Sequence, residues 1–120
     1  MTWWMYKALY ISPMIPSFDL QETISFFQHL LGFEIVMEVK NYAILHKDQL
    51  SVHILRAGPD IGEMEFYLQV DSIEPVWKRI LQKPEGLKYR EPFDRGYGMR
   101  EIHIIIPSTK TLLFVGEVIK

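Results

Sequence analysis

The chain has 120 residues, of which 48% are hydrophobic, 13% aromatic and 23% charged, and its formal net charge is −2. This is the size of one ordinary domain with enough apolar surface for a packed core, which disfavours a disordered chain. A near-neutral charge without clustered lysines and arginines gives no sign of a nucleic-acid partner. The sequence contains no cysteine, which excludes disulfides, thiolate metal sites and cysteine nucleophiles. No apolar run approaches the ~20 residues that span a bilayer and no secretory leader is visible, so we expect a cytoplasmic protein without a membrane partner.

The first half of the chain begins with a β-prone segment over 8–15 and continues into a helix. Asp19, followed three residues later by Glu22, is typical of a helix start. Gly32 stands where a helix C-terminus favours a left-handed residue, and apolar residues recur at helical spacing between these two ends. Three strands separated by short polar turns are expected next: 33–39, 42–46 and 50–55.

An Ala-Gly-Pro-Asp-Ile-Gly linker ends the first half, and the same order then begins again. The segment 64–70 alternates apolar and polar side chains and predicts a strand. A second helix is expected over 71–82. Pro75 is tolerated only in a first turn, which places the helix start at Asp71 or Ser72. The remaining strands are expected over three ranges: 88–93, 100–106 and 111–119.

The two halves therefore share the order strand, helix, strand, strand, strand. The repeat is one of pattern, because few residues are identical between the halves. We predict a single α+β domain over 1–120 with two βαβββ modules, the first over 7–57 and the second over 63–119.

Several stretches resemble the vicinal-oxygen-chelate superfamily, the group of glyoxalases, bleomycin-resistance proteins and extradiol dioxygenases. They are DLQETISFFQHLLGFEI, YAIL, VDSIE, REIHIIIP and LLFVGE, and the resemblance as a whole covers roughly Lys7 to Glu117. The last of them is similar to the final strand of the bleomycin-resistance branch. The resemblance implies a glyoxalase/bleomycin-resistance-like fold whose strands form a cupped mixed sheet around a ligand site. It also implies a homodimer in which the partner completes the cup.

Metal-dependent members of this superfamily take His, Glu or Gln ligands from four inward strand positions. The matching positions here are about Ser12, Ser51 or Val52, Glu65, and Leu113 or Phe114. Only Glu65 is a good ligand, so the resemblance implies that the metal site is lost, and we expect no cofactor. One alternative stays open, a displaced metal site formed by His53, Glu65 and His103, with Glu101 on the same strand face as His103.

Alternation along the strands places aromatic, methionine and polar side chains on the inner face of the cup. Such a set suits a small-ligand pocket, in which apolar area gives affinity and a few polar groups give orientation. His53, Glu65 and Tyr67 are costly to bury without partners, which favours an open pocket over a filled core. The expected lining residues are Tyr10, Ser12, Met14, His53, Glu65, Tyr67, His103 and Phe114.

Two aromatic features lie outside these strands. Phe93 and Tyr97 belong to a glycine-containing loop that in the resembling family often covers the pocket mouth, so both join the expected ligand-binding set, with Arg95 as a further contact. A plain hairpin with a solvated Arg95 is the alternative. Trp3 and Trp4 precede the first strand, and we expect one of them to pack against a dimer partner or the end of the pocket.

Three functional hypotheses follow. The first is a metal-independent small-molecule-binding protein of the bleomycin-resistance type, which confers antibiotic resistance by sequestering its ligand in a dimeric cup, with Glu65 facing a cationic ligand group. The second is a metal-dependent lyase, isomerase or dioxygenase of the same superfamily with a displaced or partner-supplied metal. The third is a structural or regulatory module with a filled cup. No serine or threonine stands in a recognisable nucleophile motif, so we assign no catalytic residue.

Overall fold

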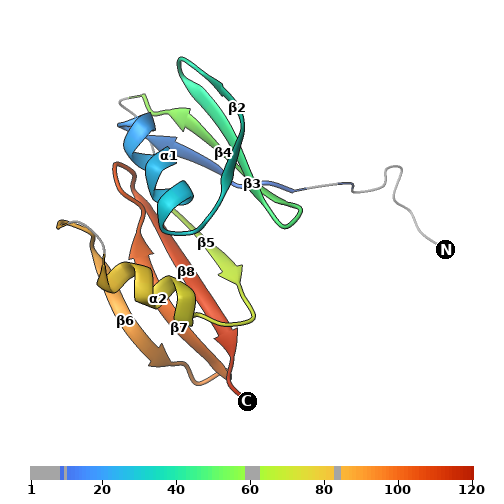
Figure 1. The fold of residues 1–120 in the computed structure, drawn as a ribbon, viewed down its shortest axis with the longest axis vertical. Coiled ribbons are helices and arrows are strands. Elements are labelled where there is room, and N and C mark those ends of the chain that lie inside the picture. The colour runs from blue at the N-terminus through green and yellow to red at the C-terminus, as the bar shows by residue number, and fades with distance from the viewer. Residues whose placement is uncertain (1–8, 10, 59–62, 83–84) are drawn as a thin grey trace.

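The fold repeats one unit twice (Figure 1). A computed structural model describes residue 9 and residues 11–58, 63–82 and 85–120. The first module contains β1 (Met14–Ser17), α1 (Leu20–His29), β2 (Glu34–Val39), β3 (Tyr42–Lys47) and β4 (Leu50–Arg56). The second contains β5 (Met64–Gln69), α2 (Glu74–Leu81), β6 (Tyr89–Asp94), β7 (Met99–Ile105) and β8 (Thr111–Val118).

Each module forms a four-stranded mixed sheet with the same strand order. The orders are β1-β4-β3-β2 in the first module and β5-β8-β7-β6 in the second. The first strand of each module pairs in parallel with its last strand, and the other neighbours pair antiparallel. A parallel pair needs a long crossover, and the helix and the two intervening strands provide it. The predicted α+β fold of two βαβββ modules is confirmed.

The two helices start by different means. In α1 the Asp19 carboxylate accepts a hydrogen bond from the Glu22 backbone N–H at 3.2 Å, as the sequence indicates. The start predicted for α2 is two to three residues too early, because Ile73 is its N-cap and has no side-chain cap of its own. The carboxylate of Glu117, on β8, accepts from the Ile73 N–H at 2.6 Å, and the Ser72 hydroxyl accepts from the Glu74 N–H at 3.3 Å. A local serine and a distant strand thus share the first N–H groups of α2, and no local motif reveals the contribution of Glu117.

Strand β1 begins later than expected and extends further. Its ladder with β4 runs from Met14, opposite His53, to Ser17, opposite Arg56. Pro16 is tolerated because β1 is an edge strand, where a missing N–H costs no ladder hydrogen bond. The expected positions of Tyr10, Trp3 and Trp4 lie outside the described residues.

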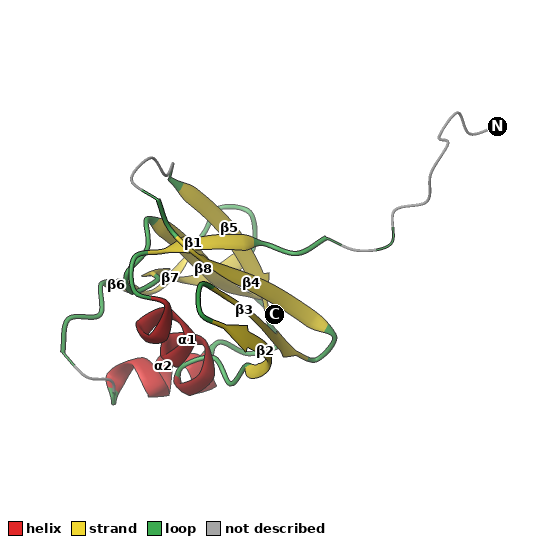
Figure 2. Cartoon of the chain, turned by 90° about the horizontal axis from the view of Figure 1, so that it is seen from above, coloured by secondary structure: helices red, strands yellow, loops and turns green. Residues whose placement is uncertain are grey.

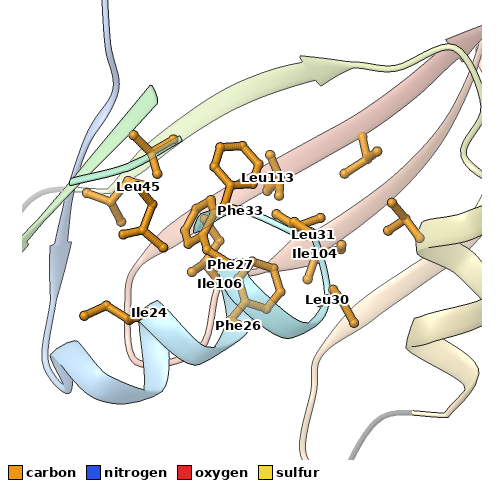
Figure 3. Packing of buried hydrophobic residues seen from close by; sticks show 14 of the residues in the cluster. Ile24, Phe26, Phe27, Leu30, Leu31, Phe33, Leu45, Ile104, Ile106 and Leu113 are labelled. Atoms are coloured by element: carbon orange, nitrogen blue, oxygen red, sulfur yellow. The ribbon is translucent and has the colours of Figure 1, made fainter. Parts of the chain in front are cut away.

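The two modules share one hydrophobic core on the helix side of their sheets. Figure 2 shows both helices on the same side of the strands. Phe27 and Phe33 of the first module lie near Ile104 and Leu113 of the second, and all four side chains are buried (Figure 3). The sheet faces that point away from the helices are therefore left outside this core. Neither described helix is long and apolar enough to cross a membrane.

A chain of buried hydroxyls joins the modules. The Thr23 hydroxyl on α1 donates to the Pro107 carbonyl, in the β7–β8 turn, at 2.8 Å. Because its one proton is used there, it accepts from Ser17 at 2.7 Å, and Ser17 in turn accepts from the Asp19 N–H at 3.1 Å. Ser17 and Thr23 are both fully buried. The first turn of α1 is thereby fixed against the second module.

Thr23→Val tests this junction, because valine keeps the shape of threonine and removes its hydroxyl. The substitution leaves the proton of the Ser17 hydroxyl without its acceptor and the Pro107 carbonyl without the threonine donor, and we expect a loss of about 1–3 kcal/mol in the free energy of unfolding. Urea denaturation measures it, with Ser25→Ala on the exposed face of α1 as the control. An unchanged midpoint for Thr23→Val would contradict this role.

Candidate functional site

The face of the second sheet that points away from the helices carries the densest polar network of the described chain. Along β7, Ile102 and Ile104 are buried in the core, whereas Glu101 and His103 alternate with them and point to the opposite side. Register aligns these side chains with residues of the neighbouring strands. We call this surface the outer face and define it by Tyr67, Arg90, Phe93, Glu101, His103 and Phe114.

Glu101 is the centre of the outer face. Its side chain has no exposed surface, yet it is a carboxylate. The Tyr67 hydroxyl donates to one carboxylate oxygen at 2.8 Å, and the Tyr97 hydroxyl donates to the same oxygen. The other oxygen lies 2.9 Å from Nη1 of Arg95 and 2.8 Å from Nε2 of His103. A buried charge is tolerated only when it is paired and hydrogen-bonded, and four side chains meet that requirement here.

The network sets the ionisation of its members. Burial alone raises the pKa of Glu101, but hydrogen bonds from Tyr97, His103 and Tyr67 and the charge of Arg95 outweigh it and hold the pKa at about 2, below its ordinary 4.5. Burial and the hydrogen bond to Glu101 raise the pKa of Tyr67 well above its ordinary value. The hydrogen bond to Glu101 also raises the pKa of Tyr97. At neutral pH the site therefore holds an ionised carboxylate and two neutral phenols.

Aromatic rings surround this carboxylate. The His103 ring centroid lies 4.1 Å from that of Phe114 and 4.9 Å from that of Phe93. The Tyr67 ring lies 6.1 Å from Phe114. Tyr67 is 41% exposed although its hydroxyl is tied to a buried group. The Tyr67 ring, fixed from below and open above, can stack against a ligand.

Gly116 makes room for this arrangement. It lies on β8 directly opposite Glu101, and a Cβ at Gly116 would overlap the hydroxyl of Tyr67. The Tyr67 ring therefore crosses the missing side chain to reach Glu101. Glycine inside a strand often marks such a close approach, so the FVGEV segment carried a signal for it.

The first module contributes a separate pair. The Tyr42 hydroxyl is hydrogen-bonded to Nδ1 of His53, with the ring centroids 5.6 Å apart. Met14 lies opposite His53 in the ladder, and the Ser12 hydroxyl donates to the Ser51 carbonyl at 2.9 Å. Within the described ranges no interaction joins this pair to Glu101. The structure thus divides the predicted lining set between two sheets.

The structure brings Tyr67, Phe93, Tyr97, His103 and Phe114 together. Sequence reasoning did not include Glu101 in the ligand-binding set, although it noted the shared strand face with His103. The solvated Arg95 of the plain-hairpin alternative is wrong, because Arg95 is bonded to Glu101. Glu65, to which we gave most weight, is exposed and takes part in no hydrogen bond or ion pair within the described residues.

The residues at the superfamily's metal positions do not fit a metal. Val52 and Leu113 are buried on the helix side, and of the candidates on the other side only Glu65 is a strong donor. The displaced alternative is not assembled either, since His53 is bonded to Tyr42 and His103 to Glu101. Among the residues that the structure describes, no three His, Cys, Asp or Glu side chains are grouped so that they could hold an ion.

A groove of about 1040 Å³ lies elsewhere, between α1, the end of α2 and the β7–β8 turn. Phe26, His29, Arg79 and Ile106 are among its lining residues. Among the described residues the buried polar side chains are Ser17, Thr23, Glu101 and Thr111, and none of them lines this groove. The outer face is the better candidate site, because binding sites combine apolar surface with fixed polar groups.

Acid dependence of stability tests the Glu101 network. The folded-state pKa lies near 2, below the ordinary 4.5, so the network stabilises the fold fully above pH 4.5 and its contribution is lost as the pH falls toward 2. The contribution corresponds to roughly 3 kcal/mol. We expect Glu101→Gln to flatten the loss of unfolding free energy between pH 4.5 and 2, measured by denaturation at each pH. Glu65→Gln is the matched control and should keep the wild-type slope; an equally steep slope in Glu101→Gln would contradict the assignment.

Gly116→Ala tests the close approach of Tyr67. The added methyl group displaces the tyrosine from Glu101, and we expect a loss of about 1–3 kcal/mol in unfolding free energy. In a Tyr67→Ala background the same change should cost much less, which a double-mutant cycle measures. Gly96→Ala is the control, since a Cβ there meets nothing within 4 Å. Equal costs in both backgrounds would show that Tyr67 does not occupy this space.

No family model and no curated protein matches the chain. Solved structures do match it. A bleomycin resistance determinant encoded on the transposon Tn5 superposes with a TM-score of 0.76 at 21% identity, over 92% of this chain and 98% of that one. A bleomycin-binding protein complexed with bleomycin gives 0.72 at 20% identity, over 92% and 98%. A glyoxalase-related enzyme from Clostridium phytofermentans gives 0.76 at 16% identity, over 96% and 98%. The chain therefore has the fold of the glyoxalase and bleomycin-resistance proteins.

Proposed function

We propose that the chain is a metal-independent protein that sequesters a small molecule on the outer face of the second sheet, as a homodimer whose second copy covers that face. The observation that carries the proposal is the Glu101 network. The Glu101 carboxylate holds its four hydrogen-bond partners in place, and these are Tyr67, Arg95, Tyr97 and His103. Tyr67 and Tyr97 remain 41% and 58% exposed.

The energetics favour a binding role for this network over a structural one. An apolar core of the same volume stabilises a fold as well as a buried ion pair does, or better, so stability alone gives little reason to bury Glu101. A fixed network instead pre-organises the rings above it, which lowers the entropy cost of binding. Two of the similar structures are of proteins that their descriptions link to bleomycin, which agrees with a binding role for this fold.

Exposed apolar side chains support the homodimer. Met14 in the first module is 50% exposed, and Ile105 and Val118 in the second are 43% and 51% exposed. All three stand in strands, on the sheet sides that alternate with the buried core positions, where a partner copy would cover them. A two-fold dimer would place the same surface of each copy against its partner and bury it on both.

A metal-dependent enzyme is the second candidate, and one similar structure is described as a glyoxalase-related enzyme. The candidate would need histidines that are free to bind an ion. In the structure His103 contacts Glu101 and His53 contacts Tyr42. A metal would have to break both interactions, which supports the metal-independent proposal.

Thermal-shift measurements with and without EDTA test the proposal. The compounds are metal-free bleomycin, cationic aromatic drugs and small oxo-acids, and a bound compound must raise the melting temperature by mass action. We expect at least one to do so equally in both conditions, and Phe114→Ala to remove the shift by removing a ring of the face. Phe18→Ala, at an exposed phenylalanine outside the outer face, should retain it.

Two results would contradict the proposal. One is a shift that disappears with EDTA and returns with a divalent metal, together with metal in elemental analysis of the purified protein, which would favour the enzyme. The other is a shift that Phe114→Ala leaves unchanged, which would place the ligand elsewhere. Light scattering of the purified chain should give the mass of a dimer, and a monomer would remove that part of the proposal.

A further inference from the structure

The outer face presents a row of flat groups across all four strands. Register places Tyr67 opposite Phe114, Phe114 opposite His103, and His103 opposite Arg90. With strands about 4.8 Å apart, the row is about 14 Å long, the length of a small polycyclic molecule. Its two ends lie on the edge strands β5 and β6 (Figure 1).

Glu101 cannot serve as the partner of a ligand cation. Its carboxylate is fully buried, and each of its oxygens already has two donors. Arg95 compensates its charge at 2.9 Å. The acidic group at the centre of the face is thus part of the support, and a ligand meets the rings above it.

On the β6 side of the outer face, the charged groups with free hydrogen-bond donors are the guanidinium groups of two arginines. The Arg90 guanidinium lies 3.5 Å from the Phe93 ring centroid, and within the described chain no carboxylate forms an ion pair with it. Arg95 lies 5.4 Å from the same ring and uses only Nη1 toward Glu101 and His103, which leaves its other N–H groups without a described acceptor. Glu65 is on the opposite edge strand, β5. A guanidinium that is held by a ring and has free donors binds carboxylate or phosphate.

We infer that the ligand is a planar aromatic anion, whose ring stacks on Phe114 and His103 and whose carboxylate or phosphate is bound by Arg90. The inference rests on the proposed function, because it names the ligand class of that same face. It replaces the expectation of a cationic ligand group facing Glu65. Arg95 lies close enough to the Phe93 ring to contribute a second donor to the ligand anion.

Probes that share one ring system and differ in charge test the inference. They are 2-naphthoate, 2-naphthyl phosphate, neutral 2-naphthamide and the cation 2-naphthylmethylammonium, titrated into the intact chain and followed by amide chemical shifts. One charge-assisted hydrogen bond corresponds to about a tenfold gain in affinity. We expect the carboxylate or the phosphate to bind at least about tenfold more tightly than the amide and the cation. Whichever of the two anions binds more tightly shows whether the site favours a carboxylate or a phosphate ligand.

Two variants tie the preference to the residues. Arg90→Gln should reduce anion binding to the level of the amide, while Arg56→Gln, the same charge change at an exposed arginine of the first module, should leave it unchanged. Phe114→Leu should weaken all four probes. The inference is overturned if the cation binds as tightly as the anions, if Arg90→Gln keeps the preference, or if no probe binds. Bleomycin binding that depends on Phe114 would, in those cases, leave the proposed function standing.

Discussion

The buried carboxylate of Glu101 is the constraint on which the outer face depends. A charge without solvent must be surrounded by donors, and the donors here come from β5, from the β6–β7 turn and from β7 itself. Each donor also carries a ring or a guanidinium, so satisfying Glu101 fixes the groups that a ligand would meet. Gly116 is part of the same constraint, because only a missing side chain lets Tyr67 pass over β8. The network thus connects burial in the sheet to order at the surface.

Much of the fold could be predicted from the sequence, because its signals are local. Alternation in 64–70 predicted β5, and Asp19 with Glu22 predicted the start of α1. The start of α2 could not be predicted correctly, since one of its first N–H groups is bound by Glu117, far along the chain. The site was predictable in part: alternation placed Tyr67, His103 and Phe114 on one face. Alternation could not show that His53 lies apart from these residues. It gives the side of its own sheet on which a side chain stands, but not how the two sheets are placed relative to one another.

Glu101 shows why the centre of the site was harder to find than its rim. In a strand otherwise rich in isoleucine, a glutamate normally marks the solvated side, and its burial follows only from groups that the fold brings in. Tyr67 lies 34 positions away in the chain, and Arg95 and Tyr97 belong to a turn. Glu65 attracted attention because it alone resembled a metal ligand, but it has no described partner. One fold supports binders and enzymes alike, so the side chains on the face have to decide between them.

The most direct test of the account is where a bound ring lies. Intermolecular NOEs from 2-naphthoate to the aromatic protons of Phe114 and His103, present in the wild type and lost in Glu101→Gln, are the predicted result. They would show that the buried carboxylate holds the rings that the ligand contacts. NOEs to Phe26 and His29 instead would place the ligand in the groove beside α1. That result, or unchanged contacts in Glu101→Gln, would contradict the central role of Glu101.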